Sequence, residues 1–198
     1  DRLEIDFPGR LRLIFCVEQD RLALRFSGAP PWVNRLWLDL AASPGEHLYG
    51  GGEQFSVLDL RGRRLPVWVQ EQGVGRSRDL ITLVANLASG SGGTWYNTYF
   101  PMPILVSSAN WYCLAQCSAY AELDLRSSRR HRLHCWSVPE RLVMDAAPSA
   151  PELLESLSAL TGRQPPLPEW TQEGIWLGVQ GGTEAIRNKL GKAREAGV

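Results

Sequence analysis

The 198-residue sequence is poor in lysine, histidine and cysteine, and it has no long apolar run. Its 21 basic residues, of which only Lys189 and Lys192 are lysines, balance 21 acidic ones. A net charge of zero argues against nonspecific nucleic-acid binding, which needs a positive field. Because no stretch of 18 apolar residues occurs, we expect no membrane span. No signal peptide is visible, which favours a cytoplasmic location.

The spacing of the cysteines and histidines predicts neither a metal site nor a disulfide framework. The cysteines are Cys16, Cys113, Cys117 and Cys135, and they form no C-x-x-C pair. Since they lie in strand-like segments, we expect buried, reduced thiols. The three histidines lack zinc-type spacing. We therefore expect neither a metal nor a cofactor.

Short alternating segments dominate the first 147 residues. The stretches "RLALRF" (21–26) and "RLWLDL" (35–40) place leucines on one face. A period of two is typical of half-buried antiparallel strands. We interpret the more uniformly apolar runs 80–87 and 103–108 as strands buried on both faces. With glycine and proline turns between them, these segments predict an antiparallel β-sandwich over residues 1–147.

The pattern changes near residue 148. Leucines at helical spacing predict a helix that begins near Pro151 and ends at Gly162. Residues 163–170 are rich in proline, so residues 148–170 form a linking helix and connector.

Residues 171–198 contain one more change of pattern. The run "GIWLGVQ" (174–180) predicts a short apolar strand, and residues 184–197 predict an amphipathic helix between Thr183 as N-cap and Gly197 as C-cap. A single apolar strand followed by a helix needs neighbouring parallel strands to supply its hydrogen bonds. We therefore expect the first unit of a truncated α/β domain that continues beyond Val198.

Two glycine-rich stretches stand out, "YGGGEQF" (49–55) and "EQGVGR" (71–76). Consecutive glycines weaken a strand because they cost conformational entropy. Each stretch is therefore either a tight loop or a place where a ligand approaches the main chain.

The stretches "YGGGEQFSVLDLRGRRLPVWVQEQGVGR" (49–76) and "LPEWTQEGIWLGVQGGTEAIRNKLGKAREAGV" (167–198) together resemble the bacterial sulfoquinovosidases, a branch of glycoside hydrolase family 31. The segment "WYNTYFPMPILVSSANWYCLAQ" (95–116) is also similar to that family's sandwich. The resemblance implies a β-sandwich followed by a (β/α)8 barrel. It also implies retaining hydrolysis of α-linked sulfoquinovose, a sulfonated glucose, by two aspartates.

The resemblance places both catalytic aspartates beyond Val198, so it implies no catalytic residue in this chain. It matches Gln180, in "LGVQGG", to a glutamine that binds the sulfonate at the end of the first barrel strand. Barrel active sites lie at such strand ends, and an amide offers two donors to an anion. The alternative is that Gln180 only secures its loop.

The resemblance also implies that a sandwich loop reaches the barrel mouth. Glu53 and Gln54 would then face or support the sugar, and Glu71, Gln72 and Arg76 would lie at the domain seam near it. The alternatives are a solvent-exposed turn at Glu53 and an Arg76–Glu71 ion pair that closes a turn.

We therefore predict the N-terminal part of a retaining α-glycosidase for α-sulfoquinovosides, inactive without the remainder of its barrel. A family 31 α-glucosidase or α-xylosidase without sulfonate specificity is an alternative. Another is a carbohydrate-binding sandwich with a flat strip of exposed aromatic residues, which eight tryptophans would allow. A structural sandwich that forms oligomer contacts is a further alternative, and a homo-oligomer remains open.

Overall fold

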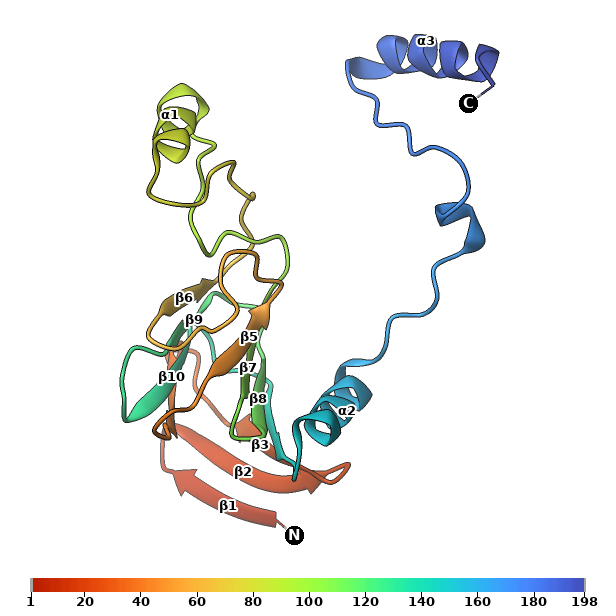
Figure 1. Cartoon of the computed structure of the whole chain (residues 1–198). Coiled ribbons are helices and arrows are strands. Elements are labelled where there is room, and N and C mark those ends of the chain that lie inside the picture. Colours follow the sequence, from red (N-terminus) through yellow and green to blue (C-terminus); the bar gives the residue numbers. More distant parts are fainter. Residues whose placement is uncertain (1, 198) are drawn as a thin grey trace. The chain divides into compact units, whose positions relative to one another are not determined.

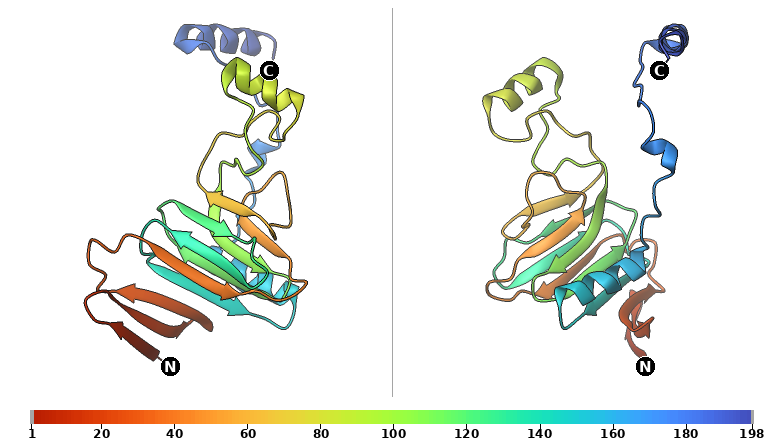
Figure 2. Two further views of the ribbon diagram at one scale, coloured as in Figure 1. Left: turned by 90° about the vertical axis from the view of Figure 1, so that its left-hand side faces the viewer. Right: turned by 45° about the vertical axis from the view of Figure 1, so that its right-hand side comes forward.

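The computed structural model describes residues 2–197, which divide into a compact unit that ends at Leu160 and a smaller unit that begins at Thr161. In the first unit, two antiparallel sheets face each other (Figures 1 and 2). The predicted antiparallel β-sandwich is therefore confirmed.

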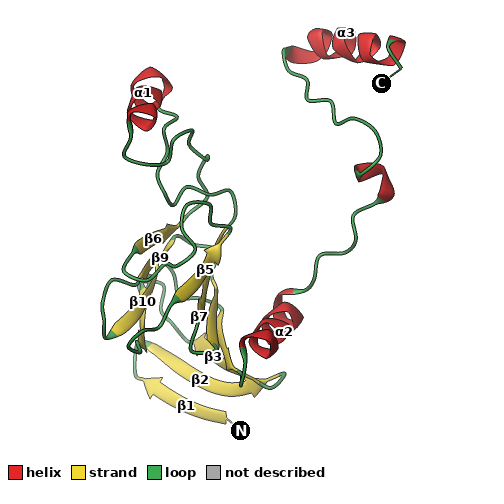
Figure 3. Cartoon of the chain, in the orientation of Figure 1, coloured by secondary structure: helices red, strands yellow, loops and turns green. Residues whose placement is uncertain are grey.

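The strands have the following order in the two sheets. The seven-stranded sheet runs β1 (Arg2–Phe7), β2 (Leu11–Glu18), β3 (Arg21–Ser27), β11 (Arg141–Ala146), β8 (Trp111–Gln116), β7 (Pro101–Ser107) and β5 (Leu48–Gly52). The four-stranded sheet runs β4 (Leu36–Ala41), β10 (Arg130–Cys135), β9 (Ala121–Asp124) and β6 (Arg64–Val67). The helices are α1 (Leu80–Ser89), α2 (Ala150–Thr161), the 3₁₀ turn η1 (Glu169–Thr171) and α3 (Gly182–Glu195) (Figure 3).

The core lies between the two sheets. On the four-stranded sheet, Leu65, Leu123 and Leu133 point inward and are almost fully buried, as period-two alternation requires. Burial of one leucine side chain stabilises the fold by about 1.5 to 3 kcal/mol. The outward positions of the same strands carry charged and aromatic side chains.

One polar network is buried in this core. Oε2 of Glu46 lies 2.7 Å from Nε2 of His131 and accepts a hydrogen bond from the amide of Ser43, while Oε1 accepts from Trp111 and Ser107. Burial alone would raise the pKa of Glu46, but these hydrogen bonds together lower it. The network ties the connection before β5 to both sheets.

Residues 80–87 form helix α1, so the strand predicted there is wrong. The Asp79 side chain caps the first turn by accepting a hydrogen bond from the amide of Thr82 at 2.8 Å. Gly90, with a φ of +68°, ends the helix. An eight-residue apolar run fits a helix or a strand equally well. Here the N-cap Asp79 and the C-cap Gly90 favour the helix.

Helix α2 belongs to the first unit. Leu153 packs with Tyr112 and Val143 on the face of the seven-stranded sheet opposite the main core (Figure 2). Arg21 donates to the Tyr112 hydroxyl at 3.0 Å and to the Ser156 carbonyl at 2.8 Å. Gly162, with a φ of +84°, follows the helix as predicted.

The second unit differs from its prediction. Residues 174–180 are coil rather than a strand, because none of the strands found in residues 2–197 pairs with them. The last helix begins at Gly182, since Gly181 with a φ of +114° is its N-cap instead of Thr183. It ends at Glu195, with Ala196 instead of Gly197 as C-cap.

The four cysteines are free thiols, as predicted. Cys113 and Cys135 are buried, and burial raises the pKa of each to about 12. Cys16 and Cys117 are only partly buried, so the prediction of full burial fails for these two. Within residues 2–197, no helix is long and apolar enough to span a membrane.

Candidate functional site

The glycine run of "YGGGEQF" is the end of edge strand β5. Its pairing with β7 shifts register between Gly50 and Gly52, and all three glycines have positive φ angles. A Cβ atom on Gly50 would lie 2.6 Å from the Ile104 carbonyl oxygen, and one on Gly52 would overlap the Phe100 carbonyl. Gly50 and Gly52 are therefore required by close packing on the neighbouring strand β7, while Gly51 lies against Leu65 of β6.

This irregular strand end carries a small hollow. A cavity of about 350 Å³ is lined by Gly50, Gly52 and residues 54–58. Its lining residues belong to the end of β5 and to the loop that follows it. A group of loops rises from this end of the sandwich (Figure 1). We call residues 50–58, 70–79 and 90–100 the loop cluster, and α1 forms its tip (Figure 3).

Glycines also hold the other two loops together. The amide of Val74 donates to the Ser91 carbonyl at 2.8 Å, and the amide of Arg76 donates to the Gly92 carbonyl at 2.9 Å. Gly73 and Gly93 approach so closely that a Cβ on either would overlap the backbone of the other. The cluster is thus packed backbone to backbone.

Arg76 connects these loops to the loop that follows β5. Its guanidinium carbon lies 4.8 Å from the centre of the Phe55 ring, and Nη2 donates to the Asn97 carbonyl at 3.4 Å. Nε is buried and has no hydrogen-bond partner in the described chain. The alternative of an Arg76–Glu71 ion pair is wrong, since the structured residues show no such contact and Arg76 is directed to Phe55.

Glu71 is held by a different part of the cluster. Its side chain accepts a hydrogen bond from the Tyr99 hydroxyl, which raises the pKa of Tyr99. Its carbonyl accepts from the Asn97 side chain at 2.9 Å. Gln72 follows, half-buried.

Glu53 and Gln54 lie at the other side of the cluster. The amide of Glu53 donates to the Phe100 carbonyl at 2.8 Å, while its side chain is exposed. Gln54 donates to the Gly51 carbonyl at 3.0 Å, and its buried Oε1 lacks a partner within residues 2–197. The structure therefore brings together five of the six predicted site residues in one cluster.

Gln180 lies in the second unit. Its side chain is exposed, and its carbonyl accepts a hydrogen bond from Nζ of Lys189 in α3 at 2.8 Å. Gln180 thus directly precedes the turn at Gly181 that begins α3.

Asn97 and Tyr99 were missed as site residues from the sequence. Asn97 contacts both Glu71 and Arg76, and Tyr99 contacts Glu71. Asn97 also accepts from Thr94. An asparagine among glycine, threonine and aromatic residues is a turn signal that could have drawn attention to this segment.

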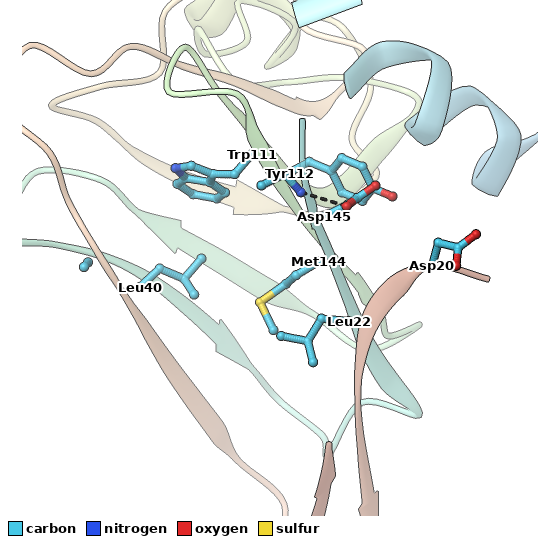
Figure 4. Close-up of a pocket in the computed structure, with 9 residues that line it drawn as sticks. Asp20, Leu22, Leu40, Trp111, Tyr112, Met144 and Asp145 are labelled. Carbon is cyan, nitrogen blue, oxygen red and sulfur yellow. Dashed lines mark hydrogen bonds between the residues drawn. The ribbon is translucent and has the colours of Figure 1, made fainter. Parts of the chain in front are cut away.

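A larger cavity lies elsewhere on the sandwich. It has a volume of about 560 Å³, and apolar side chains, among them Leu22, Leu40 and Met144, dominate its walls. Figure 4 shows Met144 beside Leu22, with Trp111 and Asp145 above them. None of the predicted site residues lines this cavity. In the part of the chain that the structure describes, no group of three His, Cys, Asp or Glu side chains could hold a metal ion.

Comparison with known proteins identifies relatives over nearly the whole chain. Residues 10–81 match the glycosyl hydrolase 31 N-terminal galactose mutarotase-like domain. The chain is 44% identical to the sulfoquinovosidase of Escherichia coli strain K12, covering 91% of this chain and 27% of that protein. It is 39% identical to the sulfoquinovosidase of Agrobacterium fabrum strain C58, covering 96% and 29%.

A solved structure agrees with these matches. A family 31 sulfoquinovosidase from E. rectale in complex with the aza-sugar inhibitor IFGSQ is 34% identical, with a TM-score of 0.82 over 98% of this chain and 29% of that one. The chain spans less than a third of the length of each relative. The resemblance found in the sequence is confirmed: the chain is a homologue of the sulfoquinovosidases of glycoside hydrolase family 31, and residues 10–81 match that family's N-terminal domain.

Proposed function

We propose that the protein containing this chain is a retaining α-glycoside hydrolase that cleaves α-sulfoquinovosides. The observation that carries the proposal is 44% and 39% identity to two sulfoquinovosidases over at least 91% of the chain. Residues 1–147 would form its sandwich domain, residues 148–170 the link, and residues 171–198 the first strand–helix unit of its barrel.

In this proposal the two catalytic carboxylates lie outside residues 1–198, and residues of this chain help to bind the substrate. Retaining glycosidases place two carboxylates about 5 Å apart, one as nucleophile and one as acid and base. Gln180 would donate its amide hydrogens to the sulfonate, since an amide binds an anion without bringing a second charge into the site. Residues 174–180 would become a strand when neighbouring barrel strands supply hydrogen bonds.

The loop cluster would meet the sugar beside the barrel mouth. The exposed carboxylate of Glu53 can accept a hydrogen bond from a sugar hydroxyl or hold a barrel arginine. Gln54, whose amide donates to the Gly51 carbonyl, would support Glu53 from inside the cluster. Glu71, Gln72 and Arg76 would keep the cluster in place at the domain seam.

Hydrolysis by the complete protein tests this function. It should release 4-nitrophenol from 4-nitrophenyl α-sulfoquinovoside, and NMR should show the α-anomer of sulfoquinovose as the first product. The 198-residue chain alone should be inactive. No hydrolysis, or the β-anomer first, would contradict the proposal.

A further inference from the structure

The outer face of the four-stranded sheet carries side chains in an ordered array. Strand pairing sets the outward residues in rows across β4, β10, β9 and β6. One row consists of Trp37, His134, Glu122 and Pro66, and the next of Asp39, Arg132, Asp124 and Arg64. Neighbouring rows are two residues apart along each strand, which is roughly 7 Å.

Five aromatic rings form a continuous strip along one side of this face. We call the aromatic strip Trp37, His134, Trp136, Tyr120 and Trp68. The Trp37 and His134 rings are stacked with centroids 4.5 Å apart, and the next three ring pairs follow at 3.8, 4.6 and 5.7 Å. Because each ring is held by the next, the strip is a rigid surface.

The two ends of the strip are open to solvent. Trp37 is 54% exposed and Trp68 is 52% exposed, although both belong to packed ring pairs. Nε2 of His134, between Trp37 and Trp136, is buried and has no hydrogen-bond partner among residues 2–197. Half-exposed tryptophan rings fixed by neighbours can stack on a flat apolar surface such as the CH face of a sugar ring.

Arginines adjoin the aromatic strip on the same face. A cavity of about 350 Å³ is lined by Asp124, Arg126, Ser127, Arg130 and Arg132. The Asp39 carboxylate accepts hydrogen bonds from both Arg130, at 3.2 Å, and Arg132, at 2.6 Å. One negative charge is therefore paired with two positive ones.

This face is therefore positive although the chain as a whole is neutral. Five arginines stand against three carboxylates, an excess of two positive charges: Arg35, Arg64, Arg126, Arg130 and Arg132 against Asp39, Glu122 and Asp124. Its electrostatic complement is an anion, and guanidinium groups suit the oxygens of sulfonate or phosphate.

We propose that this outer face is a binding site for an acidic sugar, specifically a soluble sulfonated glycoside. The sugar ring stacks on Trp37, and its sulfonate lies one row away, beside Asp39, where the guanidinium groups of Arg130 and Arg132 meet. One row, roughly 7 Å, leaves room between a ring on Trp37 and these guanidinium groups for the exocyclic carbon, its sulfonate and a hydrogen bond. The choice of sulfonate rests on the proposed function, whereas the ring stack and the excess of arginine do not.

Calorimetric titration of the complete protein with sulfoquinovose tests this site, because the proposed hydrolysis does not consume that sugar. Trp37→Ala should bind one molecule fewer per chain than the unaltered protein. Trp32→Ala is the matched control, since Trp32 is 65% exposed and lies outside the strip, and it should keep every site. Glucose, which lacks the sulfonate, should bind this site at least about tenfold more weakly.

A second variant, Arg130→Ala, tests the same site if Trp37→Ala proves to be unfolded. Arg130 is exposed, so its removal should leave the melting temperature within about 2 °C and weaken the Trp37-dependent site at least about tenfold. Hydrolysis by the unaltered protein is measured separately, so either proposal can fail alone. Equal numbers of sites in the unaltered protein and in folded Trp37→Ala would overturn the inference. So would unchanged affinity in Arg130→Ala.

Discussion

The guanidinium carbon of Arg76 lies 4.8 Å above the ring of Phe55, and this contact joins the loop after β5 to the loop after β6. Arg76 has a φ of +62°, which is uncommon for a residue with a side chain. Its Nη2 also reaches the Asn97 carbonyl, so one side chain touches all three segments of the loop cluster. The cluster that carries Glu53 is therefore held by a specific long-range contact.

Loss of this contact should loosen the segment beside Glu53. A cation–π contact contributes about 0.5 to 1 kcal/mol, so Arg76→Leu should open residues 53–58 about two- to fivefold more often. Hydrogen exchange followed by mass spectrometry measures this in the complete protein. Arg78→Leu, two residues along and exposed, is the control and should exchange like the unaltered protein. Equal exchange in both variants would contradict the prediction.

Glu53 should matter for turnover. Glu53→Gln keeps the size of the side chain but removes its charge, so a bound hydroxyl or a paired barrel arginine loses its carboxylate. We expect kcat of the complete protein on an α-sulfoquinovoside to fall at least about tenfold. Glu140→Gln, also exposed but away from the cluster in sequence, should leave kcat unchanged. A normal rate in Glu53→Gln would refute a role for this carboxylate.

The glycine run should tolerate no side chain at its end. Gly52 and Gly62 have similar φ angles of +85° and +78°, but a Cβ on Gly52 would overlap the Phe100 carbonyl, whereas Gly62 faces open space. Gly62→Ala should cost about 1 kcal/mol of unfolding free energy from the left-handed backbone. Gly52→Ala should cost about 1 to 3 kcal/mol more. Urea unfolding compares the two, and equal costs would argue against the tight β5–β7 approach.

Acid stability should depend on Glu18. Its side chain is 2.6 Å from both Arg25 and Arg141, and the hydrogen bond from Arg25 is the main reason that its pKa falls from 4.5 to about 2. A lowered folded-state pKa gives stability that is present above pH 4.5 and lost as the pH falls toward 2. The difference in melting temperature between the unaltered protein and Glu18→Gln should therefore shrink across that range. A constant difference would contradict this role.

The sandwich could be predicted because its signal is local. Inward positions such as Leu65, Leu123 and Leu133 alternate with polar ones, and burial of one face requires that pattern. Helix α1 could not be distinguished from a strand by its apolar run alone, although Asp79 and Gly90 flank it as caps. Residues 174–180 have the composition of a strand, but a parallel strand exists only beside another one.

The loop cluster was only partly predictable. The sequence pointed to Glu53, Gln54, Glu71, Gln72 and Arg76 through glycine patterns and a resemblance. It could not show that Arg76 stacks on Phe55, because that pair is separated by 20 intervening residues and depends on how three loops fold together. The sequence likewise allowed a strip of exposed aromatic residues but could not say which residues form it. Cross-strand register decides which tryptophans lie next to one another.

The ratio of kcat/KM for 4-nitrophenyl α-sulfoquinovoside to that for 4-nitrophenyl α-glucoside tests the central claim most directly. The complete protein should favour the sulfonated substrate at least about a hundredfold, because a site built for polar contacts rejects an analogue that leaves them unpaired. Gln180→Leu should lower kcat/KM for the sulfonated substrate and leave that for the glucoside unchanged. A ratio near one in the unaltered protein would contradict specificity for sulfoquinovosides.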